Sequence, residues 1–227
     1  METEMKTGLK GQVASLNVGK PKTMEYRNQP LSTGIYKLPV AGKVALHMEG
    51  FDGDGQADLV NHGGPDKAVC VYPVEHYAYW EEQLDRKLDY SAFGENITAR
   101  GLLETEVCIG DVYEIGTALL QVSQPRFPCF KLSQKHGPAD MPARVLSTGF
   151  SGFYFRVLRE GRIAAGDQIV KQESGNGGFT VKQVLYFMEH GRKDQSGLAE
   201  LARLESLASG IRERFQRWLE AAESAES

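Results

Sequence analysis

The chain has 227 residues, of which 41% are hydrophobic and 25% are charged, and its formal net charge at pH 7 is −4. This length suits one large domain or a domain with an appendage, and the composition is that of a soluble globular protein. The acidic balance argues against a broad nucleic-acid-binding face, which is usually basic, and no stretch is apolar enough to span a bilayer.

The cysteines and the first residues indicate a cellular compartment. Cys70, Cys108 and Cys129 are too widely spaced for a CxxC zinc or redox pair. Cys70 and Cys108 lie in apolar stretches, where a thiol packs like a small hydrophobic side chain. The first residues, METEMKT, lack the apolar core of a secretory signal. We therefore expect reduced thiols in a cytoplasmic protein that does not act at a membrane.

The first part of the chain reads as short strands separated by turn residues. Strands are expected at residues 11–18, 34–40, 44–48 and 68–72. Pro21 and Pro30 predict a long loop between the first two of them. Residues 51–58 hold aspartates and glycines without the ligand order of a calcium loop, so we expect a turn. Pro73 opens an amphipathic helix on which His76 falls outside the apolar face, so we expect His76 to be solvated.

The middle of the chain continues the same pattern, which is typical of an all-β barrel or sandwich. Strands are expected at residues 106–115, 118–123, 152–158 and 166–170, and a short helix at residues 143–147. The sequence therefore predicts a mostly β domain with peripheral helices over residues 1–173.

The last part of the chain changes to helical periodicity after the glycine-rich linker at residues 174–178. Thr180 and Gln183 form a predicted capping box before the first of three amphipathic helices. We expect a three-helix domain at residues 178–222. Because roughly fifty residues are marginal for an independent core, these helices should dock on the barrel or on a second subunit. Their mixed charges disfavour a helix-turn-helix that reads nucleic acid.

The segment QPRFPCFKL at residues 124–132 has the strongest chemical character. Its two prolines stiffen the backbone around Cys129. The cations Arg126 and Lys131 favour the thiolate, which attacks electrophiles or binds soft metals. The structural alternative is a buried cysteine in a strand connection.

A second polar segment, NHGGPDK, occupies residues 61–67. Gly63 and Gly64 permit positive φ, and successive backbone N–H groups in such a turn can bind an anion. Asn61 and His62 add donors, and His62 can also move a proton. The alternative is a plain glycine turn with a solvent-facing histidine.

Two further segments supply isolated polar groups. Lys37 ends STGIYK and offers a cation, with a solvated lysine as the alternative. Asn96 in FGENIT offers an amide for the edge of a heteroaromatic ligand, and ordinary turn chemistry is the alternative there.

These four segments stand in the order found in MOSC-domain proteins of the YiiM-like group, which the chain resembles over most of its length. The resemblance implies a β-barrel with a C-terminal three-helix domain. It also implies binding of the molybdenum cofactor with Cys129 as the molybdenum ligand, and reduction of N-hydroxylated compounds such as hydroxylamino-substituted bases.

On this basis we predict a cofactor site in which Cys129 binds the metal and His62 donates protons. The predicted binding residues are Lys37, Asn61, His62, Gly63, Gly64, Asn96, Arg126, Cys129 and Lys131. Dinucleotide, flavin and iron–sulfur signatures are missing from the sequence, so we expect electrons from a separate reductase protein.

Three other functions remain open at this stage. Cys129 could act as a nucleophile with His62 or His136 as its base. It could carry a persulfide, as in the sulfur-transfer relatives that the resemblance includes. The chain could also be a cofactor-binding module without activity. The sequence leaves both a monomer and a homodimer possible.

Overall fold

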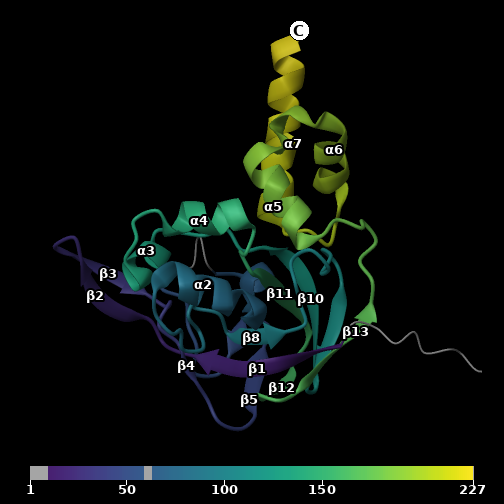
Figure 1. Ribbon diagram of the computed structural model, residues 1–227. Helices are drawn as coiled ribbons and strands as arrows, with labels where there is room; N and C mark the ends of the chain where they lie inside the picture. Colours follow the sequence, from purple (N-terminus) through teal and green to yellow (C-terminus); the bar gives the residue numbers. More distant parts are fainter. Residues whose placement is uncertain (1–9, 59–62, 227) are drawn as a thin grey trace, which may run out of the picture.

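The computed structural model describes residues 10–58 and 63–226, and its centre is a closed β-barrel (Figure 1). Seven strands pair in the order β13, β9, β10, β11, β7, β8 and β1, and β1 pairs back onto β13. The strands are β1 (Lys10–Val18), β7 (Val69–Pro73), β8 (Ile97–Arg100), β9 (Val112–Ile115), β10 (Ala118–Pro125), β11 (Phe153–Arg159) and β13 (Gln168–Glu173). The β7–β8 pair is parallel and the other neighbours are antiparallel.

The barrel interior is filled by side chains, as expected for a barrel of this size. Fully buried residues such as Val13, Val71, Ile97, Leu120 and Phe155 come from five different strands and form one continuous core. The predicted mostly β fold is therefore confirmed.

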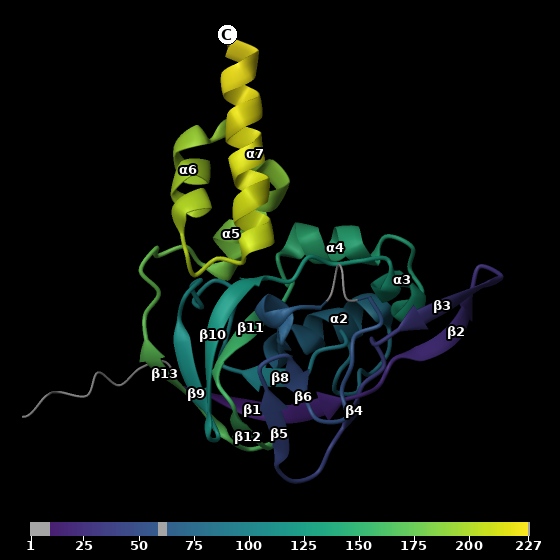
Figure 2. The same ribbon diagram turned by 180° about the vertical axis from the view of Figure 1, so that it is seen from behind.

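Shorter elements surround the barrel. The strands outside it are β2 (Lys22–Tyr26), β3 (Gln29–Thr33), β4 (Leu38–Pro39), β5 (Val44–His47), β6 (Gly50–Phe51) and β12 (Gly161–Ile163). The helices before the C-terminal part are η1 (Pro65–Lys67), η2 (Val74–His76), α2 (Tyr77–Leu84), α3 (Lys131–His136) and α4 (Met141–Thr148). Figures 1 and 2 show α2, α3 and α4 gathered on one side of the barrel, with the β2–β3 hairpin beside α3.

The predicted loop between residues 21 and 30 is wrong, because this segment is the β2–β3 hairpin. Arg27 and Asn28 have φ angles of 51° and 61°, which suit a tight two-residue hairpin turn without glycine. Pro30 is tolerated because the hairpin is a separate two-stranded sheet, so its strands have free edges.

Two other expectations from the middle of the chain also need correction. The strand predicted at residues 106–115 begins only at Val112, because the chain turns at Gly110, whose φ is +88°. His76 is buried instead of solvated. Its ring stacks on Phe150 at 3.8 Å between centroids, and its Nε2 lies 2.7 Å from the Glu104 carboxylate.

The C-terminal part consists of α5 (Val181–His190), η3 (Gly191–Lys193), α6 (Gln195–Arg203) and α7 (Ser209–Glu226). The predicted capping box of Thr180 and Gln183 is present at the start of α5. The Val181 amide donates to Val107 O and the Ala208 amide to Ser123 O, both at 2.9 Å, so the helices dock on the barrel. They share its hydrophobic core, and the domain limits at residues 173 and 178 stay a prediction. Within the described ranges, every helix is too short or too polar to cross a membrane.

Candidate functional site

A cavity opens where the cysteine loop meets the segments that follow β3 and β6. It holds about 620 Å³ of space free of protein atoms, part of it open to solvent. Five of the predicted site residues line it together: Lys37, Asn96, Arg126, Cys129 and Lys131. The structure thus brings three separate sequence segments to one place.

The predicted turn at residues 61–64 is only partly visible. Asn61 and His62 lie outside the described residues. Gly63 and Gly64 are described but do not line the cavity, and Gly64 has a φ of +90° before η1. That short helix brings Lys67, the last residue of the same motif, into the cavity wall.

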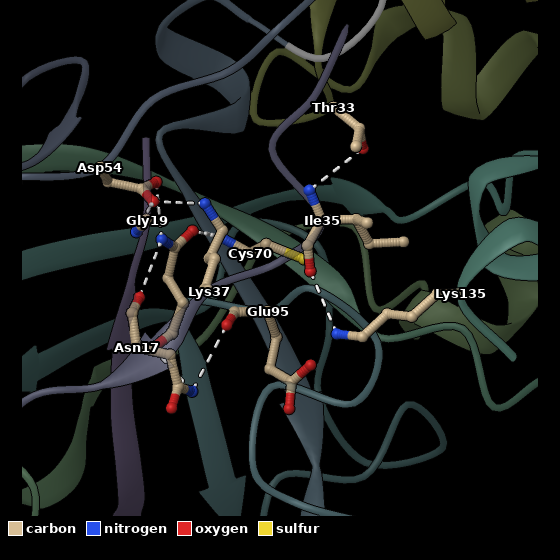
Figure 3. Close-up of polar contacts among 10 residues, drawn as sticks. Asn17, Gly19, Thr33, Ile35, Lys37, Asp54, Cys70, Glu95 and Lys135 are labelled. Carbon is tan, nitrogen blue, oxygen red and sulfur yellow. Dashed lines mark hydrogen bonds and ion pairs between the residues drawn. The ribbon is translucent and has the colours of Figure 1, made fainter. Parts of the chain in front are cut away.

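One side of the cavity, which we call the ion-pair wall, consists of Lys37, Asp54 and Asn96. The side chains of Lys37 and Asp54 are only 6% and 3% exposed and form an ion pair. Asp54 also accepts a hydrogen bond from the Gly19 amide at 2.9 Å and from Asn96 Nδ2 at 2.8 Å. Figure 3 shows Asp54 where Lys37 and Gly19 meet. The charge of Lys37 is therefore already balanced inside the protein.

Asn96 is also fully engaged within the ion-pair wall. Its Oδ1 accepts a hydrogen bond from the Cys70 amide at 3.1 Å, and its Nδ2 donates to Asn17 O at 3.3 Å in addition to Asp54. These bonds join β7, β8 and β1 at the base of the cavity. Its predicted contact with a heteroaromatic ligand stays a prediction, since such a contact would have to replace one of these bonds.

A second group of lining residues, which we call the cysteine wall, consists of Arg126, Phe127, Cys129 and Lys131. The Arg126 side chain is buried, and its Nη2 donates to Phe93 O at 2.7 Å. The guanidinium also interacts with the Tyr154 hydroxyl, and this interaction lowers the pKa of Tyr154 against the larger, opposite effect of burial. Its Nη1 is buried without a hydrogen-bond partner of good geometry within the described residues. Because an unpaired buried charged donor is costly, this atom is expected to bind an acceptor from a ligand. Cys129 is half-buried beside it on the same loop.

Helix α3, which begins at Lys131 of the cysteine wall, was not predicted, and its side chains form hydrogen bonds with neighbouring segments. Lys135 Nζ donates to Ile35 O at 3.1 Å (Figure 3) and to Ser91 O at 2.5 Å, and burial lowers its pKa to about 8. His136 donates through Nε2 to Ala92 O at 2.9 Å and accepts through Nδ1 from Arg86 at 2.8 Å. Both anchors lie on the side of α3 that faces the body of the protein.

The state of His136 bears on the nucleophilic alternative. Burial lowers the pKa of its imidazole to about 4, with the neighbouring cations adding to the effect. Both ring nitrogens are occupied by Ala92 and Arg86, so neither can accept a proton from Cys129. A hydrolase with His136 as the base is therefore not supported.

Among the cavity residues that were not predicted as site residues, four carry titratable side chains: Asp54, Lys67, Cys70 and Tyr154. Burial raises the pKa of the Cys70 thiol to about 11, while Arg126 opposes this rise. Burial also lowers the pKa of Lys67, although Asp66 and Asp58 act in the opposite direction.

Sequence signals for these four residues were weak. All five residues of β7, including Cys70, are buried, so alternation could not separate a cavity-facing thiol from core packing. Lys67 could have been predicted as a site residue, because it ends the glycine-containing segment NHGGPDK that the sequence analysis singled out.

Comparisons with known proteins identify the family and the fold. The family model described as MOSC domain matches residues 58–170. The uncharacterized protein YflK of Bacillus subtilis (strain 168) is 49% identical over 205 residues, which are 90% of this chain and 93% of that protein. The crystal structure of YiiM from Geobacillus stearothermophilus has a TM-score of 0.80 and 42% identity, covering 92% of this chain and 99% of that chain.

A further relative carries a functional name. A protein of Gibberella moniliformis (strain M3125 / FGSC 7600) called Reductase is 37% identical over 143 residues. The match covers 61% of this chain but only 25% of that protein, so the similarity concerns one part of a longer molecule.

Proposed function

The chain belongs to the MOSC-domain family, and on that premise we propose that it binds the molybdenum cofactor in the cavity and reduces N-hydroxylated compounds, such as hydroxylaminopurines, to amines. MOSC domains are associated with binding of this cofactor. The name of the Gibberella relative supports a redox reaction. The observation that carries the proposal is the buried Nη1 of Arg126, which has no partner within the described residues and lies in the same cavity as Cys129.

The residues present fit such a group. The cofactor carries a phosphate and a polar pterin, so its site must supply cations and hydrogen bonds. Lys37, Lys67, Arg126 and Lys131 are the cationic side chains among the described residues of the cavity. Arg126 would donate to an oxyanion through its unused atom, and Cys129 would bind the metal as a thiolate. When bound, the group supplies a two-electron redox centre.

Lys37 and Asn96 have a different part in this proposal. Both are bonded to the Asp54 carboxylate, so an anionic ligand that contacts either of them would have to replace that carboxylate as the partner. We assign the direct contacts to Arg126 and Lys131 and keep Lys37 and Asn96 as residues that hold the wall in place. The contributions of Asn61, His62, Gly63 and Gly64 stay predictions.

The overall reaction is R–NH–OH + 2 e⁻ + 2 H⁺ → R–NH₂ + H₂O. The electrons are proposed to come from a separate reductase protein. The protein must position the N–OH group and supply protons. His62 is the predicted proton donor, and Lys67 is a cavity residue whose lowered pKa lets it release a proton more readily than an ordinary lysine.

The test uses protein made in a host that synthesises the cofactor, with molybdenum and pterin measured per chain. The wild type should contain both, and with reduced methyl viologen as electron source it should convert a hydroxylaminopurine to the aminopurine, followed by chromatography. Cys129→Ser should lose the metal and the activity while keeping its fold, measured by circular dichroism. Full molybdenum in that variant would show that Cys129 is not the ligand.

The same preparation separates the reductase from a persulfide carrier. A carrier predicts a mass increase of one sulfur atom on Cys129 in the intact protein and no amine product. That result, in protein with confirmed molybdenum, would overturn the proposed reduction. A molybdenum-loaded protein that has neither the adduct nor any turnover would indicate a cofactor-binding module.

A further inference from the structure

Two large aromatic side chains flank Cys129 in an unusually exposed position. Phe127 lines the cavity and is 43% exposed, and Phe130 is 49% exposed. Exposed phenylalanine forgoes the favourable burial that normally determines its position, so an exposed ring in a cavity wall, as at Phe127, suggests a ligand-binding surface. Pro125 and Pro128 stiffen the backbone of the loop that carries both phenylalanines and Cys129.

The β2–β3 hairpin supports one of these rings. The ring of Tyr26, the last residue of β2, lies 5.8 Å from that of Phe130 with 33° between the planes. The Arg27 guanidinium lies 5.2 Å from the centroid of the Tyr26 ring. A weak contact from Gln134 of α3 to the sulfur of Met24, at 3.7 Å, joins the same two elements. The hairpin therefore reaches across to the segment that follows Cys129 (Figure 2).

The hairpin also continues directly into the cavity. Its second strand ends at Thr33, which lines the cavity together with Gly34 and Ile35. The same two-stranded sheet therefore has two contacts: Tyr26 packs on Phe130, and Thr33 lines the cavity. A ligand that contacts Phe127 would lie in the same cavity as Cys129 and Arg126, and Phe130 directly follows Cys129 on the loop.

We propose that Phe127 and Phe130 form an aromatic rim that selects flat, ring-bearing N-hydroxylated substrates over aliphatic ones, with Tyr26 positioning Phe130. This inference rests on the proposed function, because it concerns the substrate of the same site. The polar N–OH end would point inward to the cations and the thiol. The ring would remain at the rim, where an aromatic face can stack on it. An aliphatic compound has no such face and gains less from the rim.

The test compares two substrates in molybdenum-loaded, full-length protein: a hydroxylaminopurine and a small N-alkylhydroxylamine. Phe127→Ala and Phe130→Ala should each raise KM for the purine about tenfold, within the range for loss of one base–aromatic stack. Their kcat for the purine and their kcat/KM for the alkyl compound should change less than about twofold. Tyr26→Ala should have a smaller effect of the same kind, and Tyr26→Phe should behave as wild type because the ring contact is kept.

A matched control is available in Tyr186 of α5, which is 60% exposed and packs on His190. Tyr186→Ala removes an exposed aromatic ring remote from the cavity and should leave both substrates unaffected. Molybdenum content is measured in every variant so that loss of cofactor is not mistaken for loss of substrate binding.

A second readout needs no turnover. Titration calorimetry with the aminopurine product should show a Kd about tenfold weaker for Phe127→Ala and Phe130→Ala than for the wild type. If the variants lose kcat/KM equally for both substrates, the two phenylalanines have only a structural role and the inference is overturned. An unchanged KM for the purine would also overturn it. If the loaded wild type turns over neither substrate, the proposed reduction fails. Calorimetry then still decides the rim, because equal affinity in the variants would refute it.

Discussion

The two walls of the cavity differ in how far their polar groups are already satisfied. In the ion-pair wall, Lys37 and Asn96 are bonded to the buried Asp54 and to neighbouring strands. In the cysteine wall, Arg126 retains a buried donor without a partner in the described part of the chain, and Cys129 is accessible. Cations and amides of similar type therefore differ in how many of their hydrogen-bonding groups are used inside the protein: those of the ion-pair wall are bonded, whereas Arg126 keeps one donor unused in the described part of the chain.

The largest expected effect concerns the ion-pair wall. Lys37→Met leaves Asp54 as a buried charge without its cation and should lower the free energy of unfolding by about 3–5 kcal/mol. The double variant Lys37→Met/Asp54→Asn should recover much of this loss. Urea unfolding of the cofactor-free proteins measures both. If Lys37→Met is as stable as wild type and loses only cofactor, Lys37 is a direct ligand and the two walls are alike.

The cysteine wall should respond in the opposite way. Arg126→Gln should reduce cofactor retention by about 1.5–3 kcal/mol, since it removes a charged hydrogen bond to the ligand. Pterin and molybdenum content after dialysis measure it. Arg159→Gln is the matched control, because Arg159 forms an exposed pair with Glu114 far from the cavity. Equal retention in Arg126→Gln and the control would mean that the unused donor of Arg126 has no ligand.

A pH experiment tests the support beneath the cysteine wall. The folded-state pKa of His136 is lowered to about 4 from an ordinary value of 6.5, so the unfolded chain binds more protons between these values. The contribution of neutral His136 to the free energy of unfolding is therefore complete above about pH 6.5 and is lost as the pH falls through 4. Between pH 7 and pH 5 the loss should be about 2 kcal/mol.

His136→Gln should show a flatter decline over the same range in urea unfolding, because glutamine does not titrate. An unchanged slope would mean that His136 titrates normally and is free to take part in chemistry.

The smallest expected effect is on the molybdenum content of a variant of Cys70, the second thiol that lines the cavity. Burial raises the pKa of Cys70 to about 11, so at neutral pH it is a thiol and a poor metal ligand. Cys70→Ser should therefore keep its molybdenum content within about twofold of the wild type, in contrast to Cys129→Ser. Loss of metal in both variants would place both sulfurs in the binding site.

Local signals were sufficient for much of the fold. The strand at β1 and the capping box at Thr180 were predictable because alternation and capping depend on residues close in sequence. The β2–β3 hairpin was missed because its turn uses Arg27 and Asn28 at positive φ, where glycine is the usual signal. His76 was misplaced because the partner that buries it, Glu104, lies 28 positions away.

By itself, the sequence determined a mostly β fold, a helical C-terminal part and a stiff loop that carries Cys129 between two cations. These properties depend on side-chain periodicity and on the fixed φ of proline, which act within a few residues. Only the tertiary structure decided which cation is free. Lys37 meets Asp54, 17 residues away, whereas the carbonyl of Phe93, 33 residues from Arg126, satisfies only part of that guanidinium. Hydrogen-bond satisfaction depends on neighbours in space, so no pattern along the chain could distinguish the two.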